Sequence, residues 1–586
     1  MYNDYNFIKG VGKMDPIKVD FTGNNGKGKG NGKDAYLVPK KAGLKTVISI
    51  IGTIIGAAIA YYFMLPPINL KSTEFYLFLG VIAVIYIALQ VVLSGFIKRP
   101  EYASYIKKQS IVPVIFIGVL VVIVAVGMLI SSVVFRANSY NKIIAIDDSK
   151  TFESDIAETN FKSVPVLDDE AAAVLANRTL GDLNSINKVS QFELSNQFTQ
   201  INYRNSPVRV TTLAYGDIFK WFKNTSSGFP GYIVVDMVTQ KAELVMLEEG
   251  NYIRYSTQEH FSKYLMRHVR FAYPTYIFDE PHFEIDENGQ PFWLCPILDK
   301  TIGLFGGTDV KGVVIVNAIT GESNEYTIED VRTNPELQWI DVIYSRNLLV
   351  QQYNYYGKYG EGFINSIIFQ NDVKVASEGA NFLAMNDDVY MYTGVTSIRG
   401  DQAIIGFVLV NMRTKDANFY EVSGAKEYSA ASSAEGELQE KQYKATFPLL
   451  LNIGGQPTYF MSMKDEASLV KRFAMVNVRN YNVVVTGETI KECTNKYVAA
   501  LKKNGNNIDE TIGDDIETEV KGVITDIRTA VIGGESIYFI KLNKGDEYYR
   551  IAASGNENIV ILNVGDKVTI AYEESDGAVI NATSVN

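Results

Sequence analysis

The stretch Gly312–Tyr326 reads GVVIVNAITGESNEY and contains both arms of a β-hairpin. The apolar β-formers Val313–Val316 lead to Asn317, and a Thr320–Gly321 pair follows before the returning residues. The amide of Asn317 can accept hydrogen bonds from the backbone of its own turn, and a Thr-Gly corner reverses the chain. The stretch therefore predicts a strand, a tight turn and a second strand.

The same phrase occurs four times along the chain. The other copies are GYIVVDMVTQKAELV (Gly231–Val245), GFVLVNMRTKDANFY (Gly406–Tyr420) and, more loosely, RFAMVNVRNYNVVV (Arg472–Val485). The apolar runs end at Asp236, Asn317, Asn411 and Asn477. Their spacings of 81, 94 and 66 residues are too uneven for a regular propeller. We expect tandem α+β modules with insertions of variable length.

Another aromatic strand precedes three of these hairpins, in the stretches Pro291–Ile297 (PFWLCPI), Asp388–Thr393 (DVYMYT) and Pro457–Met463 (PTYFMSM). The aromatic lead-in and the V-[DN]-A-x-TG-E hairpin resemble the PepSY module, most clearly in NGQPFWLCPI…GVVIVNAITGESNEY and GYIVVDMVTQKAELV. PepSY-like domains are typically extracytoplasmic and are associated with peptidase propeptides and membrane-bound regulatory proteins. The whole chain also resembles uncharacterised multi-span membrane proteins of Gram-positive bacteria.

Helix signals frame these strands. Asp168 stands as a cap before a short helix over Glu170–Asn177. Ser256 and Glu259 have capping-box spacing and predict a helix over Thr257–Arg270. A further helix is predicted within Thr486–Lys503, with Thr489 and Glu492 in capping-box spacing and an apolar stripe of Ile490, Cys493, Tyr497 and Leu501.

The last part of the chain is separable. A polar linker over 504–517 follows residues 138–503, and residues 518–586 give about five short strands with a Gly565–Asp566 turn. We interpret these strands as a small OB-like β-barrel. From Val520 onward the barrel has six Lys/Arg against nine Asp/Glu, so a positive track for nucleic acid is not evident. A protein or glycan contact, or a cap on the larger domain, fits better.

Three charge-free apolar stretches lie before the strand-rich region, at 46–65, 75–97 and 111–135. Each is long enough to cross a bilayer as a helix, because about 20 residues span the hydrocarbon core. The first begins after 45 mostly polar residues, which argues against a cleaved signal peptide. We therefore expect an α-helical membrane anchor of three transmembrane helices over 46–137. A flexible Lys/Gly-rich cytoplasmic tail over 1–45 precedes it.

The flanking cations predict the orientation. Nine lysines precede the first stretch, only Lys71 lies between the first two, and four Lys/Arg lie between the last two. The positive-inside rule then places the N-terminus in the cytoplasm and everything after Arg136 outside. Residues 1–137 carry 15 Lys/Arg and 6 Asp/Glu, which leaves 40 and 60 for the rest. Such an acidic domain would be repelled by nucleic acid, so no nucleic-acid partner is expected.

The anchor itself offers few functional groups. The apolar stretches contain no ionisable residue, which disfavours an ion pathway. The small residues Gly52, Gly56 and Ala60 lie four apart and allow close helix packing. That packing can be within the three helices, which we favour, or in a homo-oligomer.

Residue types that carry chemistry are scarce. The three histidines are His260, His268 and His282, and no HExxH, GxSxG or P-loop spacing occurs. Asp279, Glu280, Glu284 and Asp286 surround His282, and we interpret them as an acidic hairpin rather than a metal site. Cys295 and Cys493 lie in apolar contexts that favour buried free thiols over a disulfide. Tyrosines of Gln351–Phe369 could stack on sugars or anchor a peptide, but more often cover a core.

We therefore assign no catalytic, cofactor-binding or metal-binding residue and no cofactor. The first hypothesis is a non-catalytic, membrane-anchored cell-envelope protein. Its large α+β, strand-rich extracytoplasmic domain would bind a protein or peptide partner, with a glycan as the alternative ligand, in a scaffold, sensor or accessory role. Another hypothesis is an extracytoplasmic hydrolase or wall-modifying enzyme that uses the carboxylates near Asp279–Asp286. A third is an accessory subunit of a transport complex.

Overall fold

The computed structural model describes residues 37–186, 190–399, 403–506, 508, 512, 518–532, 535–553, 556–572 and 578–585. The expected cytoplasmic tail lies largely outside these residues, as does most of the expected linker. The chain divides into two compact units. One comprises the residues up to Ile55 together with Ala83–Ile115, and the other comprises Gly56–Ile82 and the chain from Phe116 onward.

Three long helices begin the described chain: α1 (Ala42–Met64), α2 (Thr73–Ser94) and α3 (Ala103–Ile130). A 3₁₀ turn, Pro100–Tyr102, leads into α3. All three helices are long and apolar enough to cross a membrane. The expected third stretch of 111–135 was wrong at both ends, because the polar residues before Ile111 continue the same helix and the serines after Ile130 end it.

Ser131 and Ser132, which we call the Ser131 corner, separate α3 from α4 (Val133–Tyr140). The Ser131 hydroxyl donates to the Gly127 carbonyl at 2.6 Å and accepts from the backbone N–H of Leu304 at 2.8 Å. The end of α3 is thus bound to the strand-rich domain by side-chain and backbone hydrogen bonds. Hydropathy alone could not detect this break.

Within the smaller unit, α1 and α2 pack through a glycine. A Cβ placed on Gly52 would lie 3.0 Å from Leu89 Cδ1. Gly52 therefore packs against α2 within the chain. Nearby, the hydroxyl of Tyr105 lies 3.2 Å from Thr46 Oγ1 and donates to Gln90 Oε1 at 3.5 Å, so the polar groups here also bond within the unit.

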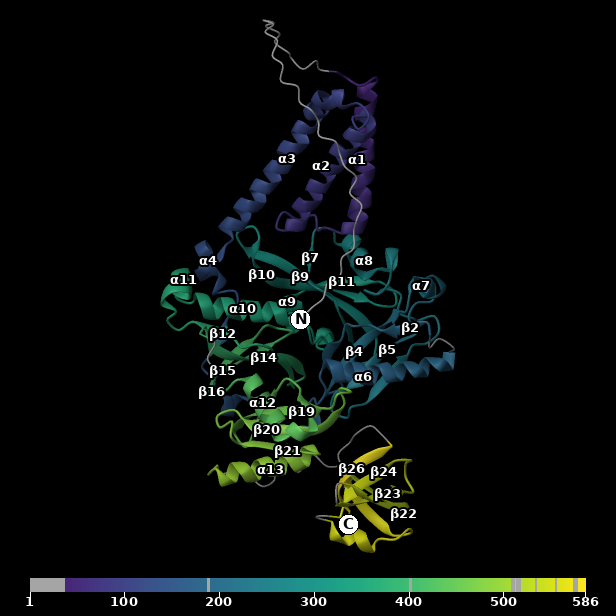
Figure 1. Cartoon of the computed structure of the whole chain (residues 1–586), viewed down its shortest axis with the longest axis vertical. Coiled ribbons are helices and arrows are strands. Elements are labelled where there is room, and N and C mark those ends of the chain that lie inside the picture. The colour runs from purple at the N-terminus through teal and green to yellow at the C-terminus, as the bar shows by residue number, and fades with distance from the viewer. Residues whose placement is uncertain are drawn as a thin grey trace, which may run out of the picture. The chain divides into compact units, whose positions relative to one another are not determined.

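Four sheets with one strand order build the large domain (Figure 1), and we call them modules one to four. In each module two short strands pair with a long central strand, and a fourth and fifth strand complete the sheet. Module one comprises β2 (Phe192–Leu194), β3 (Thr199–Tyr203), β4 (Ser206–Tyr215), β5 (Gly231–Asp236) and β6 (Ala242–Met246). Module two comprises β7 (Ile277–Phe278), β8 (His282–Ile285), β9 (Pro291–Ile302), β10 (Gly306–Asn317) and β11 (Ser323–Thr327).

The other two modules repeat this order. Module three comprises β12 (Lys374–Ala376), β13 (Asn381–Met385), β14 (Asp388–Ser397), β15 (Ala403–Asn411) and β16 (Ala417–Ala425). A sixth strand, β1 (Ile146–Asp147), joins its edge in parallel with β16. Module four comprises β17 (Lys444–Ala445), β18 (Leu449–Ile453), β19 (Gln456–Lys464), β20 (Val470–Asn477) and β21 (Val484–Gly487).

All four predicted hairpins form, as β5–β6, β10–β11, β15–β16 and β20–β21. In each, the side-chain oxygen of the strand's last residue accepts a backbone N–H of the turn. Asn317 Oδ1 accepts from Ile319 and Thr320 at 2.9 and 3.0 Å, and Asn411 Oδ1 accepts from Arg413 and Thr414, both at 2.9 Å. The predicted aromatic strands are the central strands β9, β14 and β19, and β4 is their unpredicted counterpart in module one.

Helices between the strands cause the uneven spacing of the hairpins. α7 (Ile218–Asn224) lies inside module one, α8 (Leu265–Ala272) precedes module two, and α12 (Glu427–Glu437) precedes module four. Modules two and three are separated by α9 (Ile328–Thr333), α10 (Arg346–Tyr359), α11 (Gly362–Ile364) and a π-helical turn, Asn365–Phe369. Short 3₁₀ turns lie at Phe161–Ser163, Leu180–Ile186, Phe261–Lys263, Pro335–Leu337 and Gln439–Lys441.

A segment that we call the strap, Ile143–Leu167, leads from α4 to the modules and contains β1 and the short α5 (Phe152–Asp155). The backbone N–H of Thr159 donates to the Asn452 carbonyl at 3.0 Å, in module four. The N–H of Val166 donates to the Met237 carbonyl at 2.8 Å, in module one. Because β1 also pairs with module three, the strap bonds to three of the modules.

Two predicted helix starts are confirmed. Asp168 caps α6 (Asp169–Thr179) by accepting from the N–H of Ala171, and Thr489 caps α13 (Ile490–Lys503) by accepting from that of Glu492. The predicted helix over 257–270 was wrong in its first part, since α8 begins at Leu265. Glu259 is buried and accepts from Tyr215 OH at 2.6 Å and Trp221 Nε1 at 2.8 Å, so it caps no helix.

The C-terminal strands close into a barrel of their own. They are β22 (Thr518–Ile532), β23 (Glu535–Leu542), β24 (Tyr548–Ala552), β25 (Lys567–Tyr572) and β26 (Val579–Val585), with a 3₁₀ turn at Glu557–Ile561. Their order around the barrel is β22-β23-β24-β26-β25, and β24 and β26 run parallel. A separate apolar cluster, which includes Ile540, Ile551 and Ile570, fills the interior.

Loss of a turn side chain should lower the free energy of unfolding more where the turn is buried. We expect Asn411→Ala to lower the free energy of unfolding by about 3 kcal/mol, because Asn411 is buried and its partners would lose their acceptor. Asn317→Ala, in a more exposed turn, should cost about 1 kcal/mol. Urea unfolding of the protein in detergent micelles, followed by tryptophan fluorescence, measures both. Equal costs for the two variants would contradict the role of burial.

Candidate functional site

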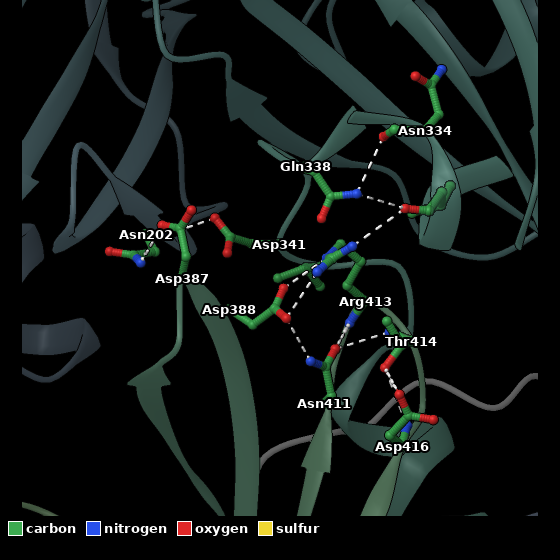
Figure 2. Close-up of polar contacts among 12 residues, drawn as sticks. Asn202, Asn334, Gln338, Asp341, Asp387, Asp388, Asn411, Arg413, Thr414 and Asp416 are labelled. Carbon is green, nitrogen blue, oxygen red and sulfur yellow. Dashed lines mark hydrogen bonds and ion pairs between the residues drawn. The ribbon is translucent and has the colours of Figure 1, made fainter. Parts of the chain in front are cut away.

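A buried ion pair stands at the centre of the polar network drawn in Figure 2. Arg413 donates from Nε to Asp388 Oδ1 at 2.6 Å and from Nη2 to Asp388 Oδ2 at 2.9 Å. The amide of Asn411 adds a hydrogen bond to Asp388 Oδ2 at 2.8 Å. Both charged side chains are only 10% exposed. Such a bidentate pair, with its remaining groups bonded, fixes module three against α9 rather than exposing a reactive carboxylate.

Two further carboxyl groups are buried beside this pair. Glu284, on β8, accepts the backbone N–H of Asp341 and of Val342, both at 3.0 Å. Asp341 in turn accepts the N–H of Asn202, on β3, at 2.7 Å. Burial raises the pKa of Glu284 to about 8, and burial together with the charge of Glu284 raises the pKa of Asp341 well above its usual range. The pair therefore tends to keep a proton at neutral pH.

The side chains of the acidic hairpin predicted around His282 form hydrogen bonds that hold the fold. His282 is half-buried, desolvation lowers its pKa, and its Nε2 is paired with the Val342 carbonyl. Asp279 accepts the Ser345 hydroxyl at 3.0 Å, while Asp286 accepts the N–H of Asn288 at 2.9 Å and so holds the β8–β9 turn. Within the described residues, no group of three or more His, Cys, Asp or Glu side chains is arranged to hold a metal ion.

The other residues singled out in the sequence are mostly parts of packed surfaces. His268 Nε2 lies 2.7 Å from the Gly321 carbonyl, and His260 packs against the Trp221 ring. Cys295 and Cys493 are both buried and are not joined in a disulfide, as predicted. The tyrosines of 351–369 belong to α10: Tyr353 is buried, and Tyr355 packs edge-on against Tyr140 of α4 with the ring centroids 4.7 Å apart. They cover a core and the α4 contact, which is the commoner of the two interpretations given above.

One hollow lies beneath the strap and has a volume of about 330 Å³. Its walls are the strap, β13 and β18, with Tyr390, Asn418 and Tyr420 from the rest of module three. The Tyr420 hydroxyl donates to Asp155, so the strap is bonded across one side of this hollow. The amide oxygen of Asn452 is buried here without a hydrogen-bond partner in the described part of the chain.

A second hollow, which we call the arginine pocket, has a volume of about 250 Å³. Its floor includes Arg209, a lone cation in the otherwise uncharged strand β4. Arg346 also lines the pocket, together with four aromatic side chains: Phe382, Tyr428, Phe447 and Phe460. Asp168 and Asp169 also line the pocket, so it combines two guanidinium groups and two carboxylates with apolar rings. A ligand carboxylate attached to an apolar or aromatic group would have to compete with Asp169 for Arg209.

The Arg209 guanidinium is incompletely paired. Arg209 is 5% exposed, and burial lowers its pKa to about 10. Nη1 is paired with Asp169, whose own side chain is 76% exposed, and Nη2 donates weakly to Gln200 Oε1 at 3.4 Å. Nε is buried without a hydrogen-bond partner among the described residues. Sequence analysis missed this residue, although a single arginine within PVRVTTLAY was a visible signal.

The comparisons with known proteins add little. No protein-family profile matches the chain, and no curated protein matches it. Among solved structures, the chain has a weak likeness to an exo-β-1,3-galactanase from Phanerochaete chrysosporium, solved with galactose. That match has 9% identity and a TM-score of 0.16, and it covers 58% of this chain and 73% of the galactanase. At that TM-score the likeness carries no argument about fold or activity.

The buried carboxyl pair predicts an unusual pH dependence of stability. Because the folded state raises both pKa values, the free energy of unfolding should fall as the pH rises from about 4.5 toward about 8. Asp341→Asn removes one acid and leaves Glu284 easier to ionise, so the fall should become smaller. Urea unfolding at pH 5 and pH 8 measures the change. Glu466→Gln, an exposed acid, is the control, and an unchanged pH dependence in Asp341→Asn would contradict the assignment.

Proposed function

We propose that this chain is a non-catalytic, membrane-anchored cell-envelope protein whose large domain lies outside the cytoplasm and binds protein or peptide partners. Support for the anchor comes from three helices that are long and apolar enough to span a bilayer. Support for the orientation comes from the cations that flank them, as argued above. We further propose that the modules are PepSY-like and the barrel OB-like. The parallel pairing of β24 with β26 in a closed five-stranded barrel supports the second assignment.

The arginine pocket carries the binding part of this proposal. A volume of about 250 Å³ is below the usual range for a drug-sized ligand and fits a side chain or a chain end. Arg209 Nε has no hydrogen-bond partner among the described residues, and Asp169 is exposed to solvent. The guanidinium can therefore donate to a ligand that binds it better than Asp169 does. A carboxylate on a peptide, from an acidic side chain or the C-terminus, supplies that partner. The aromatic walls then cover the adjoining apolar atoms.

Sidedness can be tested with one exposed cysteine. Tyr481 lies in the β20–β21 turn and is 56% exposed. Tyr481→Cys should react with a membrane-impermeant maleimide in intact cells. The wild-type protein is the matched control, because both of its own cysteines are buried and should stay unlabelled. Labelling only after permeabilisation would place the domain in the cytoplasm and overturn the proposed location.

Binding can be tested with selected peptides. Random peptides with free C-termini would be selected against the full-length protein in nanodiscs, and their affinities measured by fluorescence anisotropy. We expect acidic peptides whose affinity falls at least about tenfold in Arg209→Met, because hydrogen bonds to a buried charge are worth about 1.5–3 kcal/mol. Arg204→Met, on the exposed β3–β4 turn, is the matched control. Equal binding by both variants, or no selected peptide, would reject the pocket as the binding site.

A further inference from the structure

Several large apolar side chains of the described domain face solvent around α7 and α8. Phe219 is 79% exposed and Phe222 is 65% exposed, and Phe261 and Phe271 are more than half exposed. We call these four residues, with Ile218, the aromatic ridge. Single exposed apolar residues are ordinary, but five on neighbouring elements need an explanation.

The aromatic ridge is continuous with the end of the first candidate span. Phe271 packs edge-on against Tyr61 of α1, with ring centroids 5.6 Å apart. The Arg267 guanidinium lies 4.1 Å from the Tyr62 ring centroid, and its Nε donates to the Tyr62 carbonyl at 3.0 Å. Arg270 likewise donates to the Leu65 carbonyl at 2.9 Å. Thus α8 supplies donors to the Tyr62 carbonyl in the last turn of α1 and to the Leu65 carbonyl directly after it, where intrahelical N–H partners run out.

The aromatic ridge also packs against Trp221 of the domain. The Trp221 ring packs against Phe222 and Phe261, with centroid distances of 4.6 and 5.5 Å. Trp221 Nε1 donates to buried Glu259, and the Asp217 carboxylate caps α7 by accepting the N–H of Phe219 and Lys220. These contacts fix α7 while its outer phenylalanines stay uncovered. The exposure therefore belongs to a rigid element.

The composition of α7 favours a lipid surface as the occupant. Its sequence IFKWFKN combines aromatic residues with Lys220 and Lys223, and Lys263 lies close by in the turn before α8. Helices that lie in the membrane interface have this combination, in which rings enter the boundary of the acyl region and lysines meet anionic headgroups. A protein partner would not require the ridge to adjoin the end of a span.

A second exposed apolar group lies beside α4, the helix that follows the third candidate span. In Gly362–Phe369, the side chains of Ile364, Ile367, Ile368 and Phe369 are each more than half exposed. This segment contacts α4, the helix that directly follows α3 (Figure 1). Asn141 also donates from Nδ2 to the Tyr356 carbonyl at 2.8 Å and ties α4 to α10. The aromatic ridge thus adjoins the end of α1, and the segment Gly362–Phe369 adjoins α4, which follows α3.

We propose that the aromatic ridge and the segment Gly362–Phe369 enter the interfacial layer of the membrane beside the spans, so that the large domain rests on the lipid surface at two points. This proposal rests on the proposed membrane anchor but is independent of the arginine pocket. The lipid contact would hold modules one and two at a fixed height above the bilayer.

Single fluorophores in the full-length protein test the proposal. Phe219→Cys and Phe369→Cys, made with Cys295→Ala and Cys493→Ala, would each be labelled with an environment-sensitive NBD group. The protein would be placed in phosphatidylcholine/phosphatidylglycerol nanodiscs with lipids that carry a doxyl quencher near the headgroup. We expect at least twofold quenching at both sites. The matched control is Tyr481→Cys in the same background, which should show little quenching.

Quenching no stronger than at the Tyr481 control would overturn the proposal. So would protection from an aqueous quencher without doxyl quenching, because that result indicates a protein or a second copy over the ridge. A protein that fails to enter nanodiscs would instead reject the anchor, and size-exclusion chromatography distinguishes that outcome. Lys220→Gln/Lys223→Gln should reduce quenching at position 219 in anionic but not in neutral nanodiscs.

Discussion

The large domain depends on one repeated hydrogen-bond arrangement, in which an Asp or Asn at the end of the fourth strand of each module accepts backbone N–H groups of the following turn. In these turns the side-chain oxygen supplies the partner for these donors locally. In module three the same residue, Asn411, also donates to Asp388. The turn and the buried Asp388–Arg413 pair are thereby one connected network, so a defect in either should be felt in the other.

A second constraint comes from where the domain is attached. The Ser131 corner bonds the end of α3 to module two. The strap that follows α4 then bonds to modules three, four and one in turn. On the other side, α8 caps the end of α1 through Arg267 and Arg270. The ends of α1 and α3 are therefore joined to the domain by hydrogen bonds, beyond the covalent connection. These bonds lie beside the two exposed apolar groups for which the lipid contact is proposed.

The titratable groups of the domain divide into two kinds. Glu284, Asp341, Asp388 and Arg413 are buried and bonded to one another or to backbone, and they fix neighbouring elements. Arg209 differs, because part of its guanidinium is unpaired and faces a hollow with aromatic walls. Burying a charge without full pairing is costly, and such a cost is retained most readily where a ligand repays it. This contrast is the reason why the arginine pocket, and not the structural network, is proposed as the binding site.

The sequence alone determined the local structures whose signals lie within a few residues: the four hairpins, the Asp168 and Thr489 caps, the three long apolar helices and the two buried cysteines. Short-range hydrogen bonds and apolar runs decide those elements, so their residues suffice to predict them. Only the tertiary structure decided the rest. Glu259 is bonded to Tyr215 and Trp221 rather than to a helix start, and α3 ends at a serine that bonds to residues far along the chain. The arginine pocket and the aromatic ridge likewise combine residues from distant segments, and no spacing along a single stretch records which of them meet.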